Sequence, residues 1–534
     1  MGTHMDPEEF RRNGYAVVDW IADYWTHLSE RPVAPADPPG TVAALLPTGP
    51  PERGEPFDRI LADLDTVVTP GLTHWQHPGF FGYFPANTSG PSVLGDLVSA
   101  GLGVQGMLWA SAPACTEVET VMLDWLAELL DLPERFRSSG AGGGVIQDSA
   151  SSATLVATLA ALHRASAGRW RGHGLDRRYR VYTSSQAHSS VEKAVRIAGL
   201  GDDGIRAIDV DPVTLAMRPE SLRAAIEADR AVGDVPALVV ATVGTTSTTA
   251  VDPLPEIGEL CRAYGLWLHV DAAYAGAAAV CPELRWSHAG VEYADSYCFD
   301  PHKWLLTGFD CDAFWVADRA ELTEALTVLP EFLRNAASES GAVLDYRDWQ
   351  VPLGRRFRAL KLWFVLRWYG AEGLRAHVRH GIALAGHFAD LVRADERFEV
   401  VAPHPFSLVC FRLRAAHNDD NPNTADSDSP NTGIDRSETG AVPNTGIDRS
   451  KTGAVPNTDA DDPASAASAA DALNAELLAR VNATGRVHLT HTRVGGRHTL
   501  RLAVGAPQTT YREVELAWRL LRQTATTLLR GSAG

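Results

Sequence analysis

The chain has little of what marks membrane, secreted or nucleic-acid-binding proteins. It has no run of the roughly eighteen apolar residues that a membrane span needs, and no basic, apolar leader, so we expect neither membrane insertion nor secretion. Basic residues are outnumbered, with 48 Lys and Arg against 66 Asp and Glu and a formal net charge of −18. A nucleic-acid partner needs clustered positive charge and is not expected. By default the sequence predicts a cytoplasmic protein.

Cysteine is also scarce. The six cysteines lie at positions 115, 261, 281, 298, 311 and 410 and show no CxxC spacing. Disulfide frameworks and zinc sites both rely on regular cysteine spacings, so neither disulfides nor a metal is predicted. Each cysteine is expected to be a small, buried apolar side chain.

Apolar residues, by contrast, are abundant enough for a large core. A chain of 534 residues that is 45% hydrophobic exceeds one ordinary domain. Residues 1–4 look like a vector remnant before Met5, and we exclude them from reasoning about the fold. Apolar side chains then recur at helical spacing between Phe10 and Leu28, which predicts an amphipathic helix that needs a partner surface.

From about residue 90 to 380, short apolar strands alternate with helical stretches. The expected strands are 144–147, 180–183, 237–243, 266–270, 296–299 and 313–316. This alternation is typical of an α/β domain with a mostly parallel sheet covered by helices. A smaller α+β domain is expected over 381–534, with strands at 408–413 and 499–504.

A repeated segment interrupts the smaller domain. Residues 430–442 (PNTGIDRSETGAV) recur as 443–455 (PNTGIDRSKTGAV), and a third copy begins at 456. Thirteen residues are too few for a known solenoid unit. Because residues 415–470 are poor in apolar side chains, we expect a disordered insertion that carries no chemistry.

Two short segments suggest a cofactor site. Asp271 ends an apolar strand in HVDAAYAG, and Lys303 follows another in DPHKW. Functional groups of α/β sheets gather at such strand ends. A lysine can form a Schiff base with the aldehyde of pyridoxal 5'-phosphate, and a carboxylate can keep the pyridine nitrogen of that cofactor protonated. An isolated surface ion pair is the competing interpretation, and the apolar strands before both residues disfavour it.

These segments resemble the group II, aromatic-L-amino-acid decarboxylase family of pyridoxal phosphate enzymes. The resemblance covers nearly the whole chain and includes FFGYFP at 80–85, SAPACTE at 111–117, QAHSSVEK at 186–193 and PLGRRF at 352–357. It implies the fold-type I transferase architecture and a homodimer in which the N-terminal segment, residues 1–89, packs across the interface. It also implies a mobile loop near 326–342.

The resemblance also assigns cofactor contacts. The phosphate would lie at the start of a helix, where free N–H groups bind anions, with Ser149, Ala150 and Ser151 as donors. Thr246 and His302 would complete the cofactor shell. His188 would stack on the cofactor ring and move protons, with Ala273 on the opposite face.

Asp300 departs from the family, which usually has asparagine there as a phosphate ligand. A carboxylate would repel a phosphate, so Asp300 is expected to turn away, to be protonated or to bind through its backbone. The resemblance places the aromatic substrate in a pocket to which a partner contributes Gln105 and Met107. The other expected pocket residues are Trp75, Tyr83, Phe84, Ala86 and Gly354.

Phe332 is the departure with the largest expected consequence. The family normally has tyrosine here, and this tyrosine protonates the substrate α-carbon after CO2 leaves; phenylalanine has no proton to give. Reaction with O2 as co-substrate would then give an aromatic aldehyde, ammonia and hydrogen peroxide. The sequence therefore favours an aromatic aldehyde synthase, with a simple decarboxylase that forms the arylalkylamine as the alternative.

Three other classes stay open. A decarboxylase of acyclic acids would need a cationic pocket, and the aromatic residues above disfavour it. A non-catalytic protein that binds the cofactor requires that Lys303 form no Schiff base. An aminotransferase would release no CO2.

Overall fold

A twisted sheet of seven strands forms the centre of the large domain. The computed structural model describes residues 4–328, 337, 343–414 and 463–531, with the backbone alone for 463–468. The sheet order is β2-β8-β7-β6-β5-β3-β4. The strands span Gly143–Gln147 (β2), Tyr179–Ser184 (β3), Ile205–Ile208 (β4), Val235–Thr242 (β5), Trp267–Asp271 (β6), Ser296–Phe299 (β7) and Asp312–Val316 (β8).

The central strands run parallel, whereas β8 runs antiparallel to both of its neighbours, β2 and β7. This confirms the expected α/β class with a mostly parallel sheet. Six of the strands overlap the six expected ones. The seventh, β4, was not expected, because it is a short edge strand in which only Ile208 is buried.

Helices cover both faces of this sheet, as the hydrophobic strands require. On one face α6 packs over β5 to β8, and its buried alanines, among them Ala153, Ala157 and Ala160, allow a close approach. On the other face lie α5, α9 and α10. The helices of this domain span Gly90–Leu102 (α4), Pro113–Leu129 (α5), Ala150–Ala165 (α6), Trp170–His173 (α7), Ser190–Ile197 (α8), Pro219–Ala231 (α9), Leu254–Tyr264 (α10), Pro301–Trp304 (α11), Arg319–Leu326 (α12) and Ala359–Arg393 (α14).

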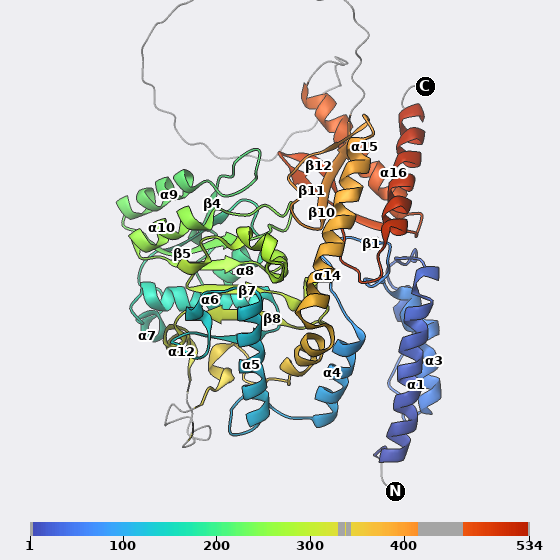
Figure 1. Cartoon of the computed structure of the whole chain (residues 1–534), viewed down its shortest axis with the longest axis horizontal. Coiled ribbons are helices and arrows are strands. Elements are labelled where there is room, and N and C mark those ends of the chain that lie inside the picture. The colour runs from blue at the N-terminus through green and yellow to red at the C-terminus, as the bar shows by residue number, and fades with distance from the viewer. Residues whose placement is uncertain (1–3, 329–336, 338–342, 415–462, 532–534) are drawn as a thin grey trace, which may run out of the picture.

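The small domain is a second sheet with the order β1-β11-β12-β10-β9. Its strands span Phe80–Phe81 (β1), Phe398–Val400 (β9), Leu408–Leu413 (β10), His488–Val494 (β11) and Arg497–Ala503 (β12), and its helices Pro463–Asn482 (α15) and Tyr511–Gly531 (α16). These two helices and the C-terminal part of α14 cover the sheet (Figure 1). Strand β1, which belongs to the segment expected to be helical, pairs in parallel with β11.

The helix α14 joins the two domains. It packs against α4 and α5 in the large domain and against β9, β10 and α16 in the small one, so the boundary expected at 380–381 lies within a helix. Its backbone kinks at Gly370, where φ is +61°, a value that favours glycine.

The disordered insertion expected at 415–470 was predicted to extend too far toward the C-terminus. Helix α15 already begins at Pro463, because the sequence from there on is rich in alanine, the strongest helix former. The rest of the insertion lies outside the described residues, as does most of the expected mobile loop at 326–342.

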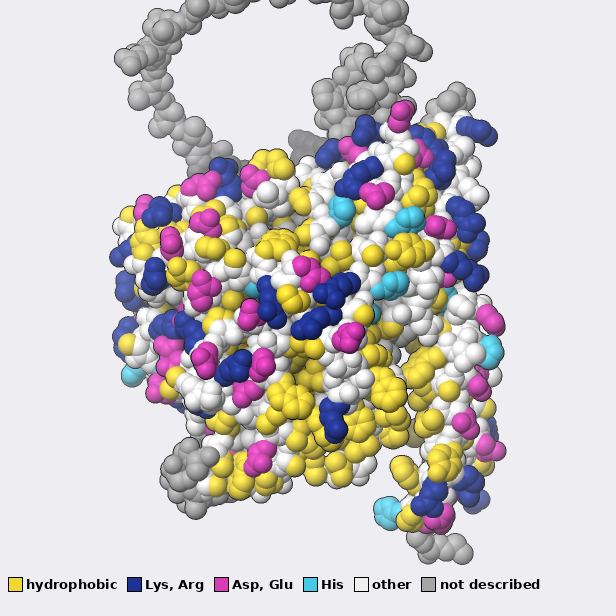
Figure 2. Space-filling model, viewed as in Figure 1, with side chains coloured by type: hydrophobic (Ala, Val, Ile, Leu, Met, Phe, Trp, Pro, Cys, Tyr) yellow, Lys and Arg dark blue, Asp and Glu magenta, His cyan; other side chains and the backbone are white. Residues whose placement is uncertain are grey.

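The N-terminal helices stand at the edge of the molecule. They span Pro7–Thr26 (α1), Thr41–Leu45 (α2) and Phe57–Asp63 (α3). Helix α1 has no buried residue, and Phe10, Tyr15 and Val18 are exposed. Figure 2 shows further hydrophobic side chains gathered on the lower part of the large domain, near α4. None of the described helices is both long and apolar enough to cross a membrane.

Candidate active site

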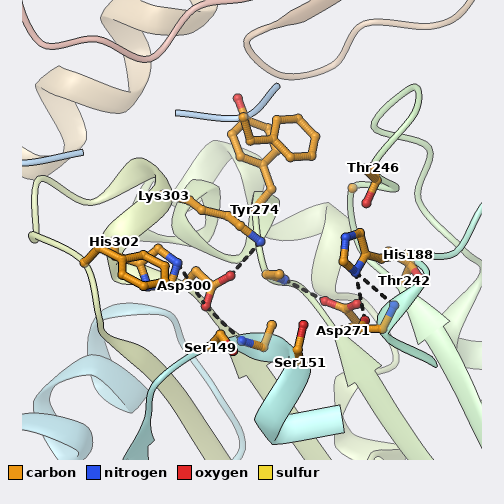
Figure 3. Close-up of a pocket in the computed structure, with 16 residues that line it drawn as sticks. Ser149, Ser151, His188, Thr242, Thr246, Asp271, Tyr274, Asp300, His302 and Lys303 are labelled. Atoms are coloured by element: carbon orange, nitrogen blue, oxygen red, sulfur yellow. Dashed lines mark hydrogen bonds and ion pairs between the residues drawn. The ribbon is translucent and has the colours of Figure 1, made fainter. Parts of the chain in front are cut away.

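A cavity of about 230 Å³ opens where the parallel strands of the large sheet end. Ligand sites of α/β sheets lie at this edge. The cavity is lined by Phe84, Ser149, Ala150, Ser151, His188, Ser190, Thr242, Gly244, Thr246, Asp271, Ala273, Tyr274, Asp300, His302, Lys303 and Phe309 (Figure 3). The structure therefore brings together every residue that the sequence assigned to the cofactor.

Lys303 extends into this cavity from α11. This short helix begins at Pro301, directly after β7, and proline suits the first position of a helix. The Nζ atom lies 2.6 Å from Oδ2 of Asp300. Burial lowers the pKa of Lys303, but the adjacent Asp300 and the more distant Asp271 outweigh it and raise the pKa. The amine is thus held as an ammonium group.

Asp300 also reaches the start of α6. Its Oδ1 accepts a hydrogen bond of 3.2 Å from the backbone N–H of Ala150. Burial raises the pKa of Asp300, but the charges of Lys303 and His302 outweigh this effect and lower the pKa below its ordinary value. The carboxyl group is therefore ionised. Two of the three alternatives expected for Asp300 do not match this structure, because its side chain points into the cavity (Figure 3) and its carboxyl group is ionised.

Asp271 holds the opposite end of the cavity. It is the last residue of β6 and is 4% exposed. Its Oδ1 accepts a hydrogen bond of 3.0 Å from the N–H of Ala273. This bond fixes the carboxylate at the strand end and leaves Oδ2 free of any hydrogen bond to the described residues.

His188 lies beside Asp271, in the loop between β3 and α8. Its Nδ1 accepts a hydrogen bond of 3.2 Å from the N–H of Ser190 and lies 2.9 Å from the Ser190 hydroxyl. A ring nitrogen that accepts from a backbone N–H carries no proton, so the proton of the neutral ring is on Nε2. Burial lowers the pKa of His188, with Asp271 acting against it. The imidazole is therefore neutral at neutral pH.

The start of α6 is suited to an anion. Ser149 is the N-cap residue, and its side chain makes no capping hydrogen bond. The hydroxyl groups of Ser149 and Ser151 border the cavity (Figure 3). Free N–H groups at a helix start bind anions well.

Thr246 reaches the cavity from a tight loop after β5. Gly244 in this loop has a φ of +85°, and a Cβ atom there would lie 2.5 Å from the Cβ of Ala275. The small domain holds the loop in place, because Arg501 of β12 donates to the carbonyl groups of Thr246 and Ser247 at 2.8 and 3.0 Å.

Phe84 and Tyr274 line one side of the cavity and belong to an aromatic stack that continues to Trp304. The rings of Phe84 and Tyr274 are 3.8 Å apart, and those of Tyr274 and Trp304 are 4.9 Å apart. The hydroxyl of Tyr274 hydrogen-bonds to Ser407 of the small domain. The stack thus ties the N-terminal segment and both domains together next to Lys303.

The other expected pocket residues do not line this cavity. Trp75 and Tyr83 stack on each other at 5.4 Å and are both exposed. The Oε1 atom of Gln105 accepts from the N–H of Arg355 at 2.6 Å, next to Gly354. Ala86 and Met107 are also absent from the lining. Phe332 lies outside the described residues.

Sequence reasoning did not single out several lining residues. Tyr274 and Thr242 stand near strand ends, and this position could have indicated that they line the cavity. For Ser190 and Phe309 the sequence offers only their closeness to His188 and Lys303 in the chain. The six cysteines are all free, and all are buried, as expected.

The residues of the cavity fit pyridoxal 5'-phosphate. Lys303 offers an amine for the aldehyde, Asp271 a carboxylate for the pyridine nitrogen, and the start of α6 N–H and hydroxyl groups for the phosphate. Thr242 adds a buried hydroxyl oxygen without a partner among the described residues. Asp300 is the exception, because its negative charge lies at the start of α6 and would repel a phosphate there.

Comparisons with known proteins agree with this fit. A family model described as the pyridoxal-dependent decarboxylase conserved domain matches residues 39–414. Phenylacetaldehyde synthase of Arabidopsis thaliana is 43% identical over 98% of this chain and 97% of its own length. Aromatic-L-amino-acid decarboxylase of Rattus norvegicus is 42% identical over 98% of this chain and 99% of its own.

The fold has a matching solved structure. The crystal structure of Oryza sativa TDC with PLP and tryptamine superposes with a TM-score of 0.88 and 39% identity, covering 99% of this chain and all of the other.

Proposed function

The chain belongs to the pyridoxal-dependent decarboxylase family, and from this premise we propose that it decarboxylates aromatic L-amino acids at Lys303. The observation that carries the proposal is the cavity in which the Lys303 amine lies between the carboxylates of Asp271 and Asp300. The names of the relatives, which include an aromatic-L-amino-acid decarboxylase and a phenylacetaldehyde synthase, support the substrate class.

Each end of the cavity would hold a different part of the cofactor. When bound, pyridoxal phosphate supplies an aldehyde carbon and an electron-withdrawing ring. Lys303 would bind the aldehyde carbon and Asp271 the ring nitrogen. Ser149, Ser151 and the N–H groups of α6 would hold the phosphate, and Thr246 and His302 would complete the surroundings of the cofactor. His188 and Ala273 would contact the two faces of the ring.

The protein's own groups also control protons. Asp300 holds the Lys303 amine as an ammonium group, so this amine must lose a proton before it can react with an aldehyde. His188 is neutral and presents a proton on Nε2. A neutral imidazole can both give and take protons near pH 7 and is suited to move them at the ring face.

We propose a homodimer in which each active site is completed by a second copy of the chain. Helix α1 buries none of its own side chains, and α4 exposes Leu94, Leu97 and Leu102. Apolar faces of this extent mark interaction sites. Gln105 and Met107 do not line the cavity of their own chain, so the second copy would supply them to the substrate pocket.

We favour an aldehyde as the product, because residue 332 is phenylalanine. The balanced reaction converts one aromatic amino acid, O2 and water into the aldehyde, CO2, ammonia and hydrogen peroxide. The α-carbon must gain a proton if the product is an amine, and Phe332 has none to give. The alternative, a simple decarboxylase, requires that another group, with His188 as the candidate, protonate this carbon.

The test is a product assay of the aerobic protein with added pyridoxal phosphate. Phenylalanine, tyrosine, tryptophan and Dopa are supplied separately, and CO2, hydrogen peroxide, ammonia, aldehyde and amine are quantified. We expect hydrogen peroxide and aldehyde in equal amounts to CO2. Phe332→Tyr should shift the product to amine, with the peroxide yield falling about 10-fold or more, since general acids contribute roughly 10²-fold or more. Amine without peroxide from the unaltered protein would overturn the aldehyde assignment and leave the decarboxylase.

A further inference from the structure

A second carboxyl group lies directly behind Asp300. Strands β7 and β8 pair antiparallel, with Phe299 opposite Ala313. The next position of this register places Asp300 opposite Asp312, and side chains so placed are neighbours. Asp300 is 1% exposed and Asp312 is not exposed at all.

The carboxyl group of Asp312 lacks a donor. Neither of its oxygen atoms has a hydrogen-bond partner among the described residues. Asp300, by contrast, is contacted by the Lys303 amine and the Ala150 N–H. Ionised carboxyl groups can only accept hydrogen bonds, so two carboxylates in this place would repel each other without any bond between them. One proton would turn the contact into a hydrogen bond.

We propose that Asp312 is a positioning residue that holds one proton between its carboxyl group and that of Asp300, so that the pair carries a single negative charge behind Lys303. Two carboxyl groups in contact share a proton for this reason in other proteins. Asp312 is too deeply buried to touch a ligand, and it acts through Asp300.

The surroundings decide which member keeps the proton. The charged and titratable groups near the pair are Lys303, His302, His188, Asp271, Cys298, Cys311 and Tyr297. Burial and the charge of Asp300 raise the pKa of Asp312 well above its ordinary value. Lys303 and His302 lower the pKa of Asp300. The proton therefore resides on Asp312, which donates to ionised Asp300.

The consequence for the cofactor rests on the proposed function, whereas the shared proton itself does not. A phosphate at the start of α6 would meet one negative charge from the pair, not two. Raising the pH through the pKa of Asp312 removes the proton and adds the second charge, so phosphate affinity should fall in alkali. An asparagine at 312 keeps an N–H donor for Asp300 and has no proton to lose.

The proton can be observed without any cofactor, by the infrared absorption of protonated carboxyl groups. Spectra are taken at about pH 8, because burial raises the pKa of Asp252 only to about 6 and that group is then ionised. The unaltered protein should show a protonated carboxyl band that Asp312→Asn removes. Asp310→Asn is the matched control, since Asp310 faces Arg358 and Lys361 instead. The absence of a protonated carboxyl band from the unaltered protein would overturn the proposal, even if the variant failed to fold.

The cofactor provides a second, independent readout. We expect the Kd of Asp312→Asn for pyridoxal phosphate near pH 7.5 to lie within about two-fold of that of the unaltered protein, because both carry one charge. In alkali the unaltered protein should lose affinity about 10-fold more than the variant. Tenfold tighter binding by the variant at pH 7.5 would show that Asp312 is ionised and overturn the proposal. If no form binds pyridoxal phosphate, the proposed function fails, and the infrared band alone decides the shared proton.

Discussion

The two ends of the cavity hold carboxylates in opposite settings. Asp271 is fixed by the backbone N–H of Ala273 and faces a neutral His188. Asp300 lies between the Lys303 ammonium group, the start of α6 and the carboxyl group of Asp312. In the proposed function, the first setting keeps a constant negative charge where the ring nitrogen of the cofactor would lie. The second limits negative charge where a phosphate would bind.

Removing the constant charge should have the largest effect. We expect Asp271→Asn to lower the rate of CO2 release by roughly 10²- to 10³-fold, because a preorganised charge at the reacting group typically contributes that much. The protein should still bind pyridoxal phosphate, which equilibrium dialysis would measure. Turnover within a few-fold of the unaltered protein would mean that Asp271 does not contact the ring.

Removing the negative charge of Asp300, at the other end of the cavity, should increase the affinity for the cofactor. In Asp300→Asn the carboxylate no longer competes for the start of α6, so we expect pyridoxal phosphate to bind about 10-fold more tightly. The pKa of Lys303 should fall as well, because Asp300 raises it. The pH dependence of the visible absorbance of the protein with pyridoxal phosphate would report this change. Weaker binding would instead show that Asp300 serves the phosphate as a ligand.

A substitution in the aromatic stack should change neither the charge of Asp271 nor that of Asp300 at the two ends of the cavity. Tyr274→Phe keeps the stack with Phe84 and Trp304 but removes the hydroxyl contact to Ser407. The free energy of unfolding should drop by about 1 kcal/mol, the usual net contribution of one hydrogen bond. Urea denaturation would measure it, with the cofactor Kd as the control that stays constant.

That Lys303, Asp271 and Ser149 would meet in one cavity could be predicted because they lie at or near strand ends in the chain. Asp271 ends an apolar strand, and Ser149 and Lys303 follow within a few residues of the ends of two others. The ends of neighbouring strands in such sheets meet at one edge. Asp312 could not be found in this way. It begins an antiparallel strand, and only the register with β7 places it behind Asp300.

The fold was predictable to a similar extent and for a similar reason. The buried central strands are continuous apolar runs, whereas β11 alternates polar and apolar side chains and β1 is two residues long. The pairing of β1 with β11 joins segments about four hundred residues apart, and no local pattern indicates such a contact. The substrate pocket was the hardest part, because the described residues of one chain leave Gln105, Met107 and Gly354 outside the cavity.

We propose that Lys303, between these two ends, is the residue that binds the cofactor. Borohydride reduction of the protein with pyridoxal phosphate, followed by mass spectrometry of its peptides, tests it directly. The chain's other lysines are Lys193, Lys361 and Lys451, so the peptides are easily told apart. We predict the phosphopyridoxyl mass on the peptide that contains Lys303 and its loss in Lys303→Ala. A modification confined to another lysine, or none at all, would contradict the account.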